Sequence, residues 1–388
     1  MSQPTPAPAA SGAAHLDRAD FTSLISALTQ HGYRIIGPTL RDGAIVLDEI
    51  SADRDLPIGI TDEHEGGHYR TKSNGKATLF AYADGPHSIK NYLYPSRSLL
   101  YRARGSNADF IVEPPDADDD TRYAFLGVRA CDIRAMSIQD KVFAEGEHAD
   151  PGYSMRRANI FIVAVHCSSP SANCFCTSMG AGPRAEAHFD LALTEVCTNN
   201  AHYFVVECGS VQGKAVLDRI PHRAATEKER IAAIDVMRHA ESRLSKTMDT
   251  VDIRDLLYSA ATNPRWEETA KRCLSCANCT MVCPTCFCST VEDTTSLTGD
   301  VADRWRVWDS CFTLDYSHIH GGSVRKTGSS RYRQWITHKL ASWYDQFGTS
   351  GCVGCGRCIT WCPVGIDITE EVAALRGAET KGKAATGG

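Results

Sequence analysis

The residues best suited to chemistry are cysteines, which repeat in one spacing at two places near the C-terminus. The copies are Cys273-x2-Cys276-x2-Cys279-x3-Cys283-Pro284 and Cys352-x2-Cys355-x2-Cys358-x3-Cys362-Pro363. Three thiolates spaced in this way surround one face of an iron–sulfur cubane, and the fourth cysteine points to the other cluster. The spacing therefore predicts two [4Fe-4S] clusters, one held by Cys273, Cys276, Cys279 and Cys362 and the other by Cys352, Cys355, Cys358 and Cys283. Zinc also binds pairs of C-x2-C, but it needs neither the third cysteine nor the Cys-Pro step, so iron–sulfur clusters are favoured.

A second group of cysteines lies at the ends of two predicted strands. Cys131 follows the run 125–130, Cys167 follows the run 160–166, and Cys174 and Cys176 come shortly afterwards. Ligands collect beyond the carboxyl ends of strands in open α/β sheets, so these four thiols can share one site. A third [4Fe-4S] cluster is favoured narrowly, and the irregular spacing leaves a zinc site or four unrelated buried thiols as alternatives.

The other five of the 17 cysteines have no such pattern. Cys197 and Cys208 have no partner at ligand spacing and are interpreted as structural. Cys286, Cys288 and Cys311 lie in the 68 residues between Cys283 and Cys352. They form either a partial metal site or ordinary buried packing, and packing is favoured because free cysteine is among the most buried residue types.

The same insertion alternates basic and aromatic side chains. This pattern indicates either a docking surface or a solvated charged face over an aromatic core. The residues concerned are Arg304, Arg306, Arg325, Lys326, Arg331, Arg333, Trp305, Trp308, Tyr332 and Trp335.

Signals for catalysis or nucleotide binding are weak. The segment Gly180-Ala-Gly182-Pro183 follows a cysteine loop instead of a strand, and 209–214 lacks one residue of a phosphate loop. The sequence contains no nucleophile elbow and no zincin motif. We expect no catalytic residue in this chain and no flavin or nickel bound by it.

The elements that position the cysteines can be predicted from hydrophobic periodicity. Helices are expected at 21–28, within 225–248 and at 252–261, and strands at 123–128, 160–165 and 203–206. Asp42-Gly43 between two apolar runs, 34–36 and 45–47, predicts a hairpin.

These elements indicate an α+β or α/β protein with three parts: an α/β domain, a helical connector and a two-cluster ferredoxin-like domain with a long insertion. The predicted boundaries are a disordered leader at 1–14, the α/β domain at 15–220, the connector at 221–263, the ferredoxin-like domain at 264–376 with its insertion at 284–351, and a flexible tail at 377–388.

Composition narrows the class of protein further. The chain has 388 residues, with 41 basic against 47 acidic side chains and a net charge of −6, which gives no general attraction to nucleic acid. No apolar run reaches the ~20 residues that span a membrane. An odd number of cysteines with no export signal favours reduced thiolate ligands and a cytoplasmic location.

Several motifs together resemble those of one family, the β subunits of soluble group 3 NiFe hydrogenases, also called sulfhydrogenases. The motifs are the ferredoxin pair, Gly127-Val-Arg-Ala-Cys131-Asp-Ile-Arg134-Ala, Cys174-Phe-Cys176-Thr-Ser-Met-Gly180 and Trp308-Asp-Ser-Cys311. Segments 32–38, 61–70 and 85–88 are similar too, so the resemblance covers most of 20–372. Related electron-transfer subunits accompany anaerobic sulfite reductases, which leaves an electron-input subunit of a sulfite or sulfur reductase as the alternative.

The resemblance implies a cytoplasmic heterotetramer. In such a complex a flavin subunit exchanges electrons with NAD(P)H, the β subunit relays them singly, and a small subunit passes them to a large subunit with the NiFe centre. The resemblance also implies that Cys131, Cys167, Cys174 and Cys176 ligate a third cluster.

Overall fold

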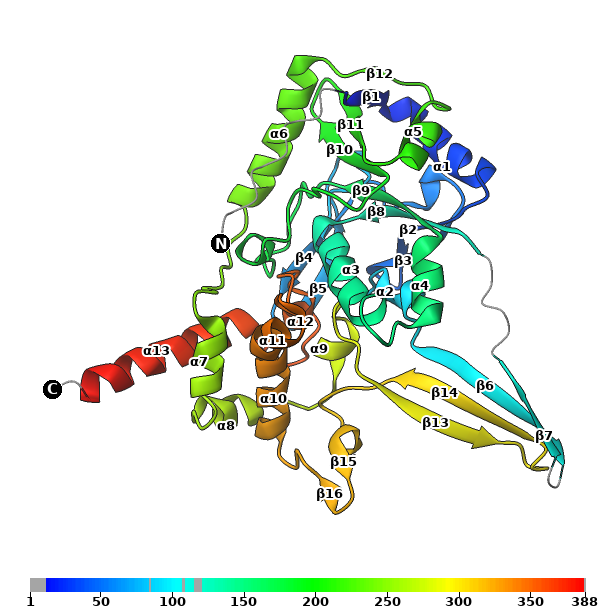
Figure 1. Cartoon of the computed structure of the whole chain (residues 1–388). Coiled ribbons are helices and arrows are strands. Elements are labelled where there is room, and N and C mark those ends of the chain that lie inside the picture. The colour runs from blue at the N-terminus through cyan, green and yellow to red at the C-terminus, as the bar shows by residue number, and fades with distance from the viewer. Residues whose placement is uncertain (1–11, 84, 107–108, 115–120, 387–388) are drawn as a thin grey trace.

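The computed structural model describes residues 12–83, 85–106, 109–114 and 121–386. Its largest feature is a mixed sheet of eight strands in the order β12-β1-β11-β10-β9-β8-β2-β3 (Figure 1). The pairs β10·β9, β9·β8 and β8·β2 are parallel, and the flanking pairs are antiparallel. The bounds are β1 (Ala14–Asp17), β2 (Arg34–Arg41), β3 (Ala44–Ile50), β8 (Tyr123–Val128), β9 (Ile160–Val165), β10 (Leu191–Cys197), β11 (His202–Cys208) and β12 (Arg223–Ala224).

The central strands are apolar on both faces because helices cover both. Alternate residues of β9 point to opposite layers, as the period of a strand requires. Phe161 and Val163 pack in the layer of α1 (Phe21–Gln30) and α5 (Val211–Leu217). Ile162 packs in the layer of α3 and α4. The bounds of the remaining helices of this domain are α2 (Lys90–Leu93), α3 (Ala130–Phe143), α4 (Pro151–Ala158) and α6 (Glu227–Ser242).

The C-terminal part is mainly helical and packs around the ferredoxin motifs. Its apolar core combines Trp266, Tyr332 and Trp335 with Ile359 and Ile368. The helices are α7 (Ile253–Ser259), α8 (Arg265–Ala270), α9 (Asn278–Met281), α10 (Gly328–Thr337), α11 (Trp343–Phe347), α12 (Arg357–Thr360) and α13 (Ile368–Thr386), with a π-helical segment, η5 (His338–Ser342), between α10 and α11.

A second sheet joins the insertion to the N-terminal part. Its order is β13-β14-β6-β7, and Figure 1 shows it extending away from the rest of the molecule. The strands are β6 (Arg97–Ser106), β7 (Asp109–Glu113), β13 (Ser289–Thr295) and β14 (Val301–Trp308). A bidentate ion pair of 2.6 and 2.8 Å between Arg102 and Asp303 crosses the junction between the two hairpins. The insertion therefore completes a sheet that residues 97–113 begin.

Two smaller hairpins and four short 3-10 segments complete the described residues. The hairpins are β4 (Ile60–Glu65) with β5 (His68–Ser73), and β15 (His318–Ile319) with β16 (Gly322–Ser323). The 3-10 segments are η1 (Arg18–Asp20), η2 (Asp53–Asp55), η3 (Cys176–Met179) and η4 (Asp315–Ser317). No helix in the described ranges is long and apolar enough to cross a membrane.

The mixed α/β class and the hairpin around Asp42-Gly43 agree with the sequence analysis, since β2 and β3 pair antiparallel there. Two boundaries differ. Residues 1–11 of the expected leader lie outside the described residues, while Ala14 already pairs with β11 and β12. The expected tail is helical, because α13 continues through Thr386. The Gly and Lys content of this segment suggested fraying, but helix-forming Ala, Glu and Lys side chains are also frequent there.

The basic and aromatic residues of the insertion serve mainly internal contacts. Arg306 pairs with Asp150 at 2.5 Å, and Trp308 donates to the carbonyl of Tyr94 at 2.9 Å. Tyr332 and Trp335 are buried. These contacts favour the charged face over an aromatic core.

Candidate iron–sulfur centres

The four cysteines expected to hold the first cluster line one hollow. Cys276 and Cys279 come from the loop before α9 and its first turn, and Cys362 comes from the turn after α12. Apolar walls close the hollow, among them Phe312, Trp335 and Ile366. The hollow is therefore largely apolar, with the exposed Cys276 at its edge.

The cysteines expected to hold the second cluster also lie together. Burial is the main cause that raises the pKa of Cys358 well above its usual value, and the nearby charges of Cys352, Cys355 and Cys283 raise it further. Burial likewise raises the pKa of Cys352 to about 12. Thiols in such a setting ionise when a metal binds them, so loading the site releases protons.

Backbone N–H groups point at several of these sulfurs. Ser275 N–H donates to Cys273 Sγ at 3.4 Å, Gly354 N–H to Cys352 Sγ at 3.4 Å, and Ile366 N–H to Cys362 Sγ at 3.3 Å. The first two bonds occupy equivalent positions in the two motifs. Hydrogen bonds of this kind stabilise thiolate ligands and raise a cluster's reduction potential.

The two motifs share a left-handed backbone but differ in the residues that adopt it. Ser275 and Ala277 have φ of +52° and +67°, and the equivalent Gly354 and Gly356 have +68° and +74°. A Cβ at Gly354 would lie 2.6 Å from a backbone oxygen, that of Phe175. The second motif therefore needs glycine because the N-terminal domain packs directly against it.

The four N-terminal cysteines line a second hollow. Cys131 lies in the first turn of α3, Cys167 follows β9, and Cys174 and Cys176 lie in the loop that ends in η3. Cys355 of the second ferredoxin motif lines the same hollow. The structure thus brings together the four thiols that the sequence analysis grouped, and it adds a contact with the second site.

A buried ion pair locks the N-terminal site to the ferredoxin motif. Arg357, between Cys355 and Cys358, forms a bidentate pair of 2.8 and 2.9 Å with Asp132, which follows Cys131. Arg357 also donates to the carbonyl of Gly85 at 2.9 Å. Both charged groups are buried, so breaking the pair would be strongly destabilising.

The donor set fits polynuclear clusters better than single ions. Throughout the described residues, no three His, Cys, Asp or Glu side chains converge closely enough to hold one metal ion. The cysteines instead surround hollows, which is the arrangement that an iron–sulfur cubane requires.

The remaining cysteines do not line either hollow. Hydrogen bonds connect Cys286 to Cys283 and Cys288 to Cys311, and the bond from Cys311 is the main cause that lowers the pKa of Cys288 to about 6. Cys197 is half-buried and Cys208 is exposed. Packing within a polar network describes Cys286, Cys288 and Cys311 best.

One functional candidate had no sequence signal. Lys339, in η5, is buried and donates from Nζ to Cys283 Sγ at 3.2 Å. Its relation to the cysteine motifs depends on the packing of the insertion, so neither spacing nor composition indicates it.

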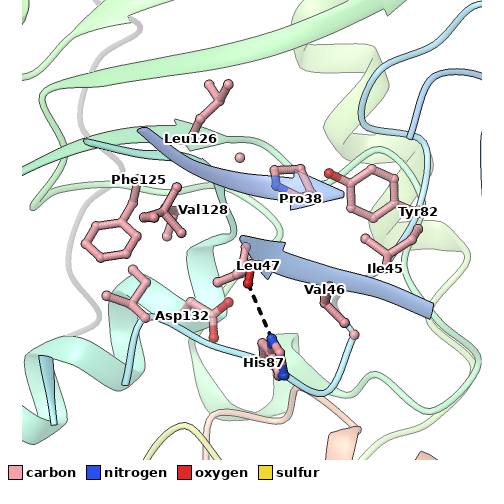
Figure 2. A pocket seen from close by; sticks show the side chains of 14 residues that line it. Pro38, Ile45, Val46, Leu47, Tyr82, His87, Phe125, Leu126, Val128 and Asp132 are labelled. Carbon is pink, nitrogen blue, oxygen red and sulfur yellow. Dashed lines mark hydrogen bonds between the residues drawn. The ribbon is translucent and has the colours of Figure 1, made fainter. Parts of the chain in front are cut away.

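Figure 2 shows a separate pocket between β2, β3 and the end of β8. Its lining is mostly apolar, including Pro38, Leu47 and Phe125. Two of the polar side chains in view are already engaged, since His87 Nδ1 is 3.4 Å from the Leu47 carbonyl and Asp132 pairs with Arg357. The pocket therefore offers no set of polar groups converging on a ligand.

Comparison with known proteins agrees with these sites. Residues 272–366 match the model of a 4Fe-4S dicluster domain. The chain is 33% identical over 290 residues to sulfhydrogenase 2 subunit beta of Pyrococcus furiosus, an alignment that covers 73% of this chain and 83% of the relative.

The chain belongs to the sulfhydrogenase β-subunit family. No solved structure matches it. The expected iron–sulfur character and the resemblance to hydrogenase β subunits are confirmed, because the dicluster match falls on both cysteine motifs of this sulfhydrogenase β-type chain.

Proposed function

We propose that this chain relays single electrons between a flavin subunit that reacts with NAD(P)H and the small subunit of a cytoplasmic NiFe hydrogenase. The observation that carries the proposal is the contiguity of the three sulfur-lined sites. Cys355 of the second site lines the N-terminal hollow, and Cys358 of the same site lines the first hollow. The second site is therefore the middle of a continuous path.

Three [4Fe-4S] clusters would occupy this path and supply one-electron chemistry when bound. The ligands would be Cys273, Cys276, Cys279 and Cys362 for the first cluster, Cys352, Cys355, Cys358 and Cys283 for the second, and Cys131, Cys167, Cys174 and Cys176 for the third. The protein's own contribution is to hold the clusters, donate hydrogen bonds to their ligands and exclude water. Flavin and nickel would belong to partner subunits.

Metal analysis of the complex that co-purifies anaerobically with this chain tests the choice of partner. We expect nickel near one per chain and iron well above the about twelve that three cubanes require. Iron without nickel would overturn the hydrogenase assignment and favour an electron-input subunit of a sulfite or sulfur reductase.

The relay itself is tested by Cys355→Ser, which changes the residue common to the second site and the N-terminal hollow. We expect NAD(P)H-linked hydrogen turnover to fall at least about tenfold, because one cluster is damaged, while hydrogen turnover with a direct artificial donor stays normal. Cys208→Ser, at an exposed position, is the matched control and should change neither rate. Normal NAD(P)H-linked rates in Cys355→Ser would contradict the relay.

A further inference from the structure

Lys339 places an ammonium group inside the protein, against the second cluster site. Its side chain is 4% exposed. Nζ donates three hydrogen bonds: to Cys283 Sγ at 3.2 Å, to Thr285 Oγ1 at 3.0 Å and to the Gly351 carbonyl at 3.0 Å. One of the three acceptors is thus a sulfur expected to bind cluster iron.

The backbone around Lys339 fixes this position. The residue lies in the π-helical segment η5, a conformation that is uncommon and often found at functional sites. Gly351 N–H donates to the Lys339 carbonyl at 2.8 Å, and Thr285 Oγ1 donates to the Gly351 carbonyl at 2.6 Å. Gly351 precedes Cys352, so the lysine is bound to both chain segments that supply the second site.

The charge of Lys339 has no carboxylate to balance it. Among the described residues, neither Lys339 nor its buried neighbour Lys90 forms an ion pair with Asp or Glu. A buried cation requires an anion nearby, and a cubane with four thiolate ligands is anionic.

Lys90 differs from Lys339 in what it contacts. Its Nζ donates to the carbonyls of Met281 and Cys286 at 3.4 and 3.2 Å and lies 3.9 Å from the centre of the Trp308 ring. None of these acceptors is a sulfur. Of these two buried lysines, Lys339 is therefore the one that donates directly to a sulfur of the second site.

Among the described residues, no side-chain ammonium or guanidinium donates a hydrogen bond to a sulfur of the first cluster site. Within the described ranges, its sulfurs receive hydrogen bonds from the backbone N–H groups of Ser275 and Ile366. Lys271, two residues before Cys273, is exposed, so solvent screens its charge.

We propose that Lys339 raises the reduction potential of the second cluster above that of the first. The second cluster is the one held by Cys352, Cys355, Cys358 and Cys283, and the first is the one held by Cys273, Cys276, Cys279 and Cys362. The inference rests on the proposed function, because it assumes that both clusters are present. Reduction adds negative charge to a cluster, and a fixed buried cation stabilises that added charge. The middle cluster of the path is then the first of the two to be reduced, and electrons collect there between the ends of the relay.

The test is a redox titration of the full chain, purified anaerobically with its clusters and followed by electron paramagnetic resonance. Signals are assigned with Cys355→Ser, which removes the second cluster, and Cys276→Ser, which removes the first. Lys339→Met removes the charge and the donor, and Lys339→Gln removes the charge while keeping an N–H donor. Lys271→Met removes an exposed charge near the first cluster and is the matched control.

We expect the equilibrium constant for reduction of the second cluster to fall at least tenfold in Lys339→Met, which corresponds to a potential about 59 mV lower for a one-electron couple. The potential of the first cluster in Lys339→Met, and the potentials of both clusters in the Lys271→Met control, should shift by less than half of that amount. Lys339→Gln should lower the potential of the second cluster as well. If Lys339→Met does not assemble its clusters, the potential measured in Lys339→Gln tests the role of Lys339.

Two kinds of failure can be told apart. A second cluster that is present in the Lys339 variants at an unchanged potential, or equal shifts in both clusters, would overturn the role of Lys339 and leave the relay intact. A wild-type chain with no signal that Cys355→Ser removes would instead overturn the proposed function.

Discussion

At the scale of single residues, Ser275 and Gly354 show how one motif can serve two surroundings. Both have positive φ and both donate N–H to a cysteine sulfur. Ser275 is half-buried and its Oγ accepts a 3.4 Å hydrogen bond from Arg331, while Gly354 lies against the backbone of Phe175. The requirement for glycine therefore comes from domain packing and not from cluster binding.

Gly354→Ala is expected to destabilise the protein by about 2 kcal/mol or more. The added Cβ would meet the Phe175 oxygen at 2.6 Å in a left-handed backbone, so the two loops must separate. Thermal unfolding of the loaded chain and its iron content measure the effect. Ser275→Gly, at the equivalent position, should change stability by no more than about 1 kcal/mol. An unchanged unfolding midpoint in Gly354→Ala would contradict the packing argument.

At the scale of elements, strand ends hold the cysteine loop in place. Glu207 of β11 accepts a bidentate pair from Arg184 at 3.0 and 2.5 Å and a 3.3 Å hydrogen bond from His166, which follows β9. Ala185 N–H donates to the other nitrogen of His166 at 3.1 Å, so the neutral Nε2–H form satisfies the network. Burial lowers the pKa of His166 and favours the same neutral form.

Glu207→Gln tests this network. Burial alone would raise the pKa of Glu207, but hydrogen bonds from His166 and Arg184 outweigh it and lower the pKa to about 2. The contribution of ionised Glu207 to the free energy of unfolding is therefore complete above the pKa of glutamate in the unfolded chain, about 4.3. This contribution is lost only as the pH falls towards 2. We expect a loss of about 1 to 3 kcal/mol at pH 7 and the same loss at pH 8.5.

Denaturant unfolding of the loaded chain at the two pH values measures this loss. Glu186→Gln, at an exposed position near Arg184, should stay within about 0.5 kcal/mol of wild type. A destabilisation that shrinks between pH 8.5 and pH 7 would show that Glu207 is not held ionised in this range.

At the scale of the whole molecule, the three sites depend on contacts between distant segments. The loop 173–176 packs on the second ferredoxin motif, where Phe175 N–H donates to the Gly354 carbonyl at 2.8 Å and Asn173 Nδ2 to Thr360 Oγ1 at 2.8 Å. The ion pair of Asp132 and Arg357 crosses the same junction. The N-terminal and ferredoxin-like parts therefore form one electron-transfer body.

Cys167→Ser tests whether this body holds a third cluster. Iron is expected to fall from about twelve to about eight per full-length chain, because one of three cubanes loses a ligand. Elemental analysis with electron paramagnetic resonance should show that both ferredoxin-type signals remain. Cys197→Ser, at a half-buried position away from both hollows, should keep the full iron content. An equal iron content in the two variants would rule out a cluster at the N-terminal site.

The sequence by itself determined the iron–sulfur chemistry and the grouping of the cysteines. In the ferredoxin motifs, neighbours such as Cys273 and Cys276 are separated by only two intervening residues, so local chain geometry dictates which thiols face one cluster. Short β-branched and aromatic runs likewise predicted β8 and β9, and helical periodicity predicted α1, because each pattern reflects burial within one element.

Only the tertiary structure decided how these parts meet. Three contacts join segments that lie tens to hundreds of residues apart in the chain. They are the contact of Cys355 with the N-terminal hollow, the sheet that β6 shares with β14, and the contact of Lys339 with Cys283. Such contacts arise when separate elements bury their surfaces together, and no periodicity within one segment records which distant segment will cover it.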